Sequence, residues 1–124
     1  MVDSAGRPVF DFEKLDVYRK ALSFTNEVYR VTKDFPREEQ FGVVAQLRRA
    51  AVSIAQNLAE GCGRRSKNDR RHFFDMARSS IYECIPLLQL SEQQRFFHDG
   101  MYDKLYEDST ELSRMLSGLI SSLR

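Results

Sequence analysis

Apolar residues recur every three or four positions along almost the whole chain, and no segment alternates apolar with polar residues in steps of two. This spacing places apolar side chains on one face of a helix and argues against strands. Helix-breaking residues divide the pattern at Asp34-Phe35-Pro36, Gly61-Cys62-Gly63 and His98-Asp99-Gly100. The sequence therefore predicts four helices, at about 14–33, 38–60, 67–94 and 101–123.

Four amphipathic helices joined by short connections are typical of an antiparallel up-and-down four-helix bundle. A chain of 124 residues fits one domain, so this all-α bundle is expected to span residues 1–124, with residues 1–11 flexible. Ser66, followed three residues later by Asp69, predicts the cap that begins the third helix. Pro86 is expected to kink that helix, because proline lacks an amide hydrogen and clashes with the preceding turn.

The third helix carries more apolar residues than one stripe can hold. Phe74, Tyr82, Ile85 and Leu87 lie away from its main stripe. This pattern predicts a second apolar face and self-association. The alternative is a helix central enough in the bundle to be buried on several sides.

Composition bounds the function. Lys and Arg number 19 against 18 Asp and Glu, so a net charge of +1 creates no long-range field that would attract nucleic acid or membrane. No apolar run approaches the roughly 18 residues that a membrane span needs, so we expect a cytoplasmic protein without a membrane partner. The chain has no phosphate-binding loop and no nucleophile elbow.

Metal and thiol chemistry are also weakly represented. Only Asp69 and His72 have the acid-to-histidine spacing of a di-metal bundle, and we interpret them as a cap and a surface histidine. Cys62 and Cys84 are expected to be reduced thiols, although the basic residues around Cys62 can lower a thiol pKa. We therefore predict no catalytic residue, no metal ligand and no cofactor.

One short segment is strongly polarised. Residues 64–71 carry a net charge of +4 in a chain whose total is +1. Clustered cations bind phosphates, so this segment predicts nucleic-acid binding, with help from two arginines outside it. The alternative is a solvated charged turn. The candidate nucleic-acid-binding residues are Arg48, Arg64, Arg65, Lys67, Arg70, Arg71 and Arg78.

A polar stripe follows one face of the second helix. If two antiparallel helices turn near residue 64, residues whose numbers sum to roughly 128 should meet. We therefore predict a pairing of Arg49 with Glu83, or of Glu60 with Arg70. Such a stripe would select helix register, and a binding or catalytic role is the alternative. The stripe and its partner comprise Gln46, Arg49, Ser53, Asn57, Glu60 and Glu83.

The same residues carry a family likeness. Residues 46–54 (QLRRAAVSI), followed by residues 57–61 (NLAEG), Gly63-Arg64 and Ser66, closely resemble the signature of bacterial four-helix bundle proteins encoded by intervening sequences in 23S ribosomal RNA genes. The likeness extends over about residues 12–123. Val43 and Pro86 depart from the family pattern.

This resemblance implies a small cytosolic bundle that assembles as a ring of five and has no established enzymatic activity. It also implies kinship with the accessory protein of diversity-generating retroelements, whose partners are a reverse transcriptase and RNA. Five copies of a +4 cluster would bring about +20 to one ring, enough to hold a polyanion. We therefore expect a non-enzymatic homopentamer that binds structured RNA. The alternative is a protein-interaction scaffold with no role in nucleic-acid binding.

Overall fold

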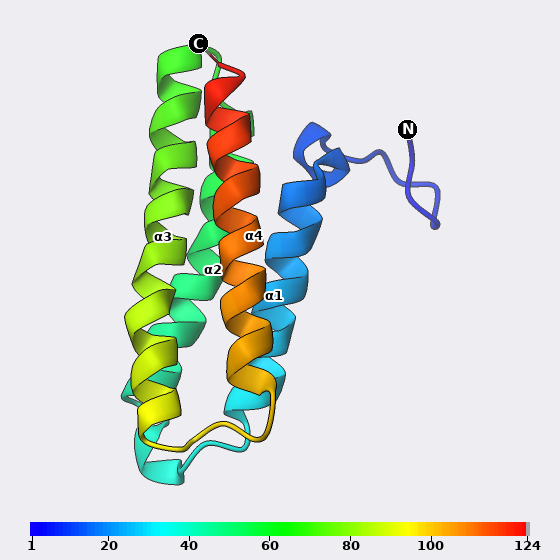
Figure 1. The fold of residues 1–124 in the computed structure, drawn as a ribbon. Helices are drawn as coiled ribbons and strands as arrows, with labels where there is room; N and C mark the ends of the chain where they lie inside the picture. Colours follow the sequence, from blue (N-terminus) through cyan, green and yellow to red (C-terminus); the bar gives the residue numbers. More distant parts are fainter. Residues whose placement is uncertain (124) are drawn as a thin grey trace.

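The computed structural model describes residues 1–123, which form four long helices running up and down side by side (Figure 1). These helices are α1 (Asp16–Thr32), α2 (Val43–Cys62), α3 (Lys67–Gln93) and α4 (Met101–Ser121). α2 packs against α1 and α3, and α4 packs against α3 and α1, so every helix touches two neighbours. The described residues contain no named strand. The predicted all-α four-helix bundle is confirmed.

Two short 3-10 helices, η1 (Asp11–Lys14) and η2 (Arg37–Glu39), flank α1. η2 accounts for the main boundary error of the sequence analysis, because α2 begins at Val43 rather than at residue 38. Pro36 has an extended backbone with ψ 140°, and Gly42 leaves the helical region again with ψ −114°. These two residues separate η2 from the helices on either side.

α3 continues through Pro86 to Gln93, close to the expected end near residue 94 (Figure 1). Proline cannot donate an amide hydrogen bond to the carbonyl of Tyr82, one turn earlier. Both residues are exposed, so water can reach that carbonyl. The start of α3 is as predicted, with the Ser66 hydroxyl accepting a hydrogen bond from the Asp69 amide at 3.1 Å.

The apolar faces of the four helices enclose one continuous core, in which Phe24, Leu47, Ile81 and Leu112 are fully buried. Phe74 belongs to this core and is only 3% exposed, so its assignment to an outward face of α3 was wrong. Its ring packs over Gly61 of α2. Tyr82, by contrast, is exposed, while Ile85 and Leu87 are half-buried. The side chains outside the main stripe of α3 are therefore partly buried and partly exposed, and self-association stays a prediction.

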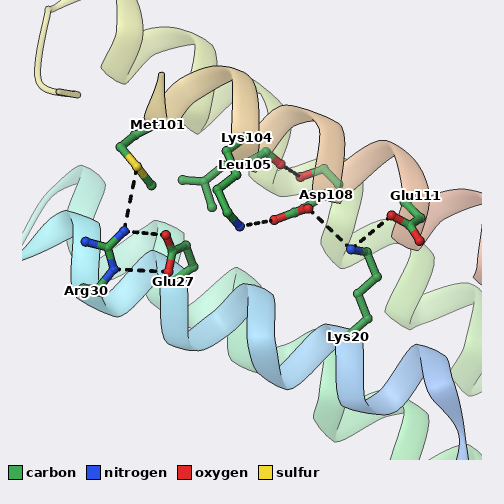
Figure 2. Close-up of polar contacts among 9 residues, drawn as sticks. Lys20, Glu27, Arg30, Met101, Lys104, Leu105, Asp108 and Glu111 are labelled. Carbon is green, nitrogen blue, oxygen red and sulfur yellow. Dashed lines mark hydrogen bonds and ion pairs between the residues drawn. The ribbon is translucent and has the colours of Figure 1, made fainter. Parts of the chain in front are cut away.

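Charged side chains join α1 to α4 (Figure 2). Lys20 Nζ lies 3.4 Å from Asp108 Oδ1 and 3.1 Å from Glu111 Oε2. Partial burial acts to lower the pKa of Lys20, but its hydrogen bonds and charge interactions with Glu111 and Asp108 raise it overall. Lys20 therefore stays protonated and ties the first helix to the last.

Within residues 1–123, every helix lacks the long apolar stretch that crossing a bilayer requires.

Candidate nucleic-acid interface

The polarised segment, residues 64–71, covers the turn between α2 and α3 and the start of α3, at one end of the bundle (Figure 1). We call its five cationic residues the basic cluster. They are Arg64, Arg65, Lys67, Arg70 and Arg71. Arg64, Arg65 and Lys67 are exposed, and Arg70 and Arg71 are half-buried. The turn therefore gathers the predicted cluster on one small surface.

Local contacts hold three of these arginines in place. The guanidinium of Arg64 lies 4.6 Å above the centre of the Phe73 ring, and its Nη2 donates to Glu60 Oε1 at 3.4 Å. Arg70 Nε donates to the backbone carbonyl of Arg64 at 2.7 Å, and Arg71 donates to the Asn68 side chain. The cluster is thus oriented by hydrogen bonds and stacking.

Few acids neutralise the basic cluster. Its only ion pair within residues 1–123 is the one between Arg64 and Glu60, and that pair is solvent-exposed. Exposed pairs of this kind contribute little free energy, so Arg64 can exchange Glu60 for another anion. Arg65 and Lys67 make no ion pair or side-chain hydrogen bond within the same range. The field of the cluster is therefore largely uncompensated.

Both cysteines are unpaired: Cys62 lies beside this turn, and Cys84 is buried farther along α3. Burial raises the pKa of Cys62, and the opposing positive charge of Arg70 does not overcome it. A neighbouring cation does act to lower this pKa, as expected, but desolvation is the larger effect. Burial also raises the pKa of Cys84, to about 12. Neither thiol is activated as a nucleophile.

Arg48 does not join the basic cluster, because it lies near the other end of α2 and holds the C-terminus of α1. Its Nε donates to Thr32 Oγ1 at 3.0 Å, and its Nη2 donates to the carbonyl of Tyr29 at 3.3 Å. The guanidinium also stacks 4.6 Å from the centre of the Tyr29 ring. Its role in the structure is to cap a helix. The sequence offers no local signal for this contact, because it depends on how α1 and α2 pair.

Arg78 is also separate from the basic cluster. It lies seven residues beyond Arg71, the last member of the cluster, about 10 Å along α3 at 1.5 Å per residue. Its Nη2 donates to the Tyr82 hydroxyl at 2.8 Å, and its guanidinium lies over the Tyr82 ring at 4.8 Å. Arg48 and Arg78 are therefore engaged in contacts of their own, apart from the five residues of the basic cluster.

The polar stripe of α2 contacts α3 at one point, where Ser53 Oγ donates to Ser80 Oγ at 2.6 Å. Asn57 turns back and donates to the carbonyl of Ser53 at 2.9 Å. Gln46, Arg49 and Glu60 are exposed. Only the middle of the stripe lies between helices.

Neither predicted ion pair forms within the described chain. Glu60 pairs with Arg64 of its own turn, and Arg49 and Glu83 make no ion pair or hydrogen bond there. The reason is register, since Ser53 meets Ser80 and Gly61 meets Phe74. These numbers sum to 133 and 135 rather than 128, so Glu60 lies beside Phe73 and not beside Arg70.

Sequence reasoning treated Gly61 only as part of a helix terminator. The structure instead places it inside the last turn of α2, where a Cβ atom would lie 2.6 Å from Cε1 of Phe74. Gly61 therefore lets the ring of α3 approach the backbone of α2. The signal available in the sequence was a glycine three positions after Leu58, in step with the apolar pattern of the helix, which is weak by itself.

His72 packs edge to face against Phe73, with 5.3 Å between ring centres. No group of three or more potential metal ligands occurs among the residues that the structure describes.

By its fold, the chain belongs to the class of small four-helix bundle proteins, with a basic cluster around the turn between α2 and α3. Comparison with family models identifies the family within this class. The family model described as 23S rRNA-intervening sequence protein matches residues 13–118. The chain belongs to this family, which confirms the family that the sequence motifs indicated.

A solved structure supports the same assignment. It is the crystal structure of a protein with unknown function from the S23 ribosomal protein family of Bacteroides thetaiotaomicron. The two chains share 25% sequence identity and superpose with a TM-score of 0.77. The match covers 84% of this chain and 97% of the other. No curated protein matches the chain.

Proposed function

We propose that this protein is a non-enzymatic, self-assembling bundle that binds structured RNA through the basic cluster. The observation that carries this proposal is the density of cations around the turn between α2 and α3, where Glu60 is the only acid that pairs with them within residues 1–123. RNA phosphates would take the place that acids leave open.

The geometry of the cluster suits phosphate oxygens. Arg70 and Arg71 are held by hydrogen bonds, so binding a phosphate through their remaining N–H groups costs less side-chain entropy than it would for unrestrained arginines. Arg65 and Lys67 extend from the same turn without partners in the described chain.

Assembly would multiply this weak local field. One copy offers a net charge of +4 from residues 64–71, and a ring of five would present about +20. An otherwise nearly neutral chain would then hold a polyanion at several points at once. The pentamer, the RNA and a relation to the accessory proteins of diversity-generating retroelements, with a reverse transcriptase as partner, all belong to this proposal.

The proposal is tested by measuring the affinity for a fluorescent RNA hairpin at several salt concentrations. The variant Arg65→Ala/Lys67→Ala should bind more weakly and reduce the slope of log affinity against log salt by about 2, one for each lost phosphate contact. The matched control is Lys33→Ala/Arg37→Ala, which removes the same charge from exposed residues at the opposite end of the bundle. This control should behave like the unmodified protein.

Equal losses in both double variants would contradict a specific role for the turn. Affinity that does not respond to salt would contradict phosphate binding altogether. The competing function, a protein-interaction scaffold, predicts that a partner protein binds with little salt dependence and that both double variants bind it normally.

A further inference from the structure

A long apolar groove runs between α1 and α2 on the outside of the bundle. Two hollows of about 550 and 260 Å³ adjoin along it and share the side chains of Val52 and Gln56. Three large apolar side chains on its walls are exposed, Leu22 at 40%, Tyr29 at 40% and Phe41 at 95%. From Ala45 to Ala59 the groove extends about 21 Å along α2, at 1.5 Å per residue. Its size and lining suit one face of a helix.

The outer side of α3 carries a ridge of matching length. Met76, Glu83 and Leu90 recur every seven residues and therefore lie on one face, with Tyr82 and Pro86 beside them. Met76 is 41% exposed, Tyr82 56% and Leu90 47%. From Met76 to Leu90 this α3 ridge spans about 21 Å.

The groove and the ridge carry opposite charges that have no partners within residues 1–123. Arg49 lines the larger hollow, which lies toward the N-terminal end of α2, and Glu83 lies in the middle of the ridge. The Ser53–Ser80 hydrogen bond shows which parts of α2 and α3 lie at the same height. Measured along the bundle axis from this hydrogen bond toward the end that carries the turn between α1 and α2, Arg49 lies four residues from Ser53 and Glu83 lies three residues from Ser80. Their positions along the axis therefore differ by only about 1.5 Å.

We propose that the α3 ridge of one copy fills the groove between α1 and α2 of the next, with Glu83 of one chain paired with Arg49 of its neighbour. This inference rests on the self-assembly included in the proposed function and identifies the surfaces that form it. When copies of the chain are related by a rotation axis parallel to the helices, equivalent residues keep the same position along that axis. Arg49 of one copy and Glu83 of the next can therefore lie side by side. Leu90 then lies near the height of Phe41.

The two surfaces are different, so the contact is heterologous. α1 packs against α2 and α4 and has no contact with α3, so a chain cannot cover its own groove with its own ridge. Each copy in such a chain of contacts uses its groove on one side and its ridge on the other, and a suitable rotation closes the chain into a ring.

Charge reversal tests the pairing. Arg49→Glu and Glu83→Arg should each weaken self-association by about 100-fold, because each places like charges in the contact. The double variant should assemble again. An equimolar mixture of the two single variants, labelled with different dyes, should also associate, because each complements the other across the contact. Glu107→Arg is a matched control on the exposed side of α4, and it should assemble normally.

The mixture separates a contact between chains from a contact within one chain. If the double variant assembles while the mixture does not, the pair acts inside one chain and the inference is overturned. It is also overturned if the unmodified protein assembles and the single variants assemble equally well. An unmodified protein that stays monomeric at all concentrations would overturn self-assembly itself, and RNA binding by the basic cluster would be judged by its own salt titration.

Discussion

The contact between Gly61 and Phe74 predicts opposite effects for the same substitution at two glycines. Gly61 lies in the last turn of α2, and Gly118 lies in the last turn of α4. Replacing either with alanine should gain up to about 1 kcal/mol of helix propensity. A Cβ atom at Gly118 meets nothing within 4 Å, whereas one at Gly61 would lie 2.6 and 2.8 Å from two ring carbons of Phe74.

The magnitude follows from these distances. Carbon atoms in contact normally lie about 3.5–4.0 Å apart, so the ring or the helix must move by about 1 Å. Phe74 is buried in the main core and has no open space to turn into. Forcing an extra methyl group into such a site costs about 1–3 kcal/mol. Because the propensity gain is similar in both variants, Gly61→Ala should be less stable than Gly118→Ala by about that amount.

Urea unfolding, followed by circular dichroism at one fixed protein concentration, measures the difference. The double variant Gly61→Ala/Phe74→Leu adds a check, because a smaller side chain relieves the clash. Its loss of stability should be smaller than the sum of the two single losses. If Gly61→Ala is as stable as Gly118→Ala, the close approach of α2 and α3 is refuted.

Three further predictions concern single side chains. Arg48→Met should lower the free energy of unfolding by about 1–2 kcal/mol, because it removes the cap of α1, and it should leave RNA affinity unchanged. A loss of RNA affinity without a loss of stability would instead show that Arg48 contacts RNA. In the native protein at pH 8, Cys84 should react with a thiol reagent far more slowly than Cys62, since its pKa is about 12, and urea should abolish the difference. Hydrogen bonding to Arg30 lowers the pKa of Glu27, so this ion pair stabilises the fold above the unfolded pKa of 4.5, and its contribution is lost as the pH falls through the folded pKa. Glu27→Gln should therefore make the urea midpoint depend less on pH between pH 5 and 3. A midpoint that falls as steeply in the variant as in the unmodified protein would contradict this prediction.

Helix number and fold class could be predicted from the sequence because apolar spacing reports directly on which face of each helix is buried. The second helix shows where this reasoning ends. Pro36 and Gly42 interrupt the apolar pattern too briefly to be distinguished from a continuous helix, so η2 was not foreseen. Phe74 was misplaced because periodicity treats every core position as equal, whereas this ring is accommodated by the missing side chain of Gly61.

The candidate site was predictable to the extent that it is local. The basic cluster lies within eight consecutive residues, so the sequence alone brings its members together. Arg48 and the pairs proposed for Glu60 depended on the register between helices, which spacing does not determine. A shift of about five residues was enough to place Phe73 beside Glu60.

The tie between Lys20 and Asp108 joins residues 88 positions apart, and it therefore bears on how the chain folds as it is made. The first helix emerges early from the ribosome but cannot complete its packing until the last helix has been synthesised. Contacts over such separations are slow to form, because a long segment of chain must be closed before they are made. A nascent chain interrupted before α4 would leave Lys20 and the flank of the first helix exposed, and such chains are the ones that chaperones would have to protect.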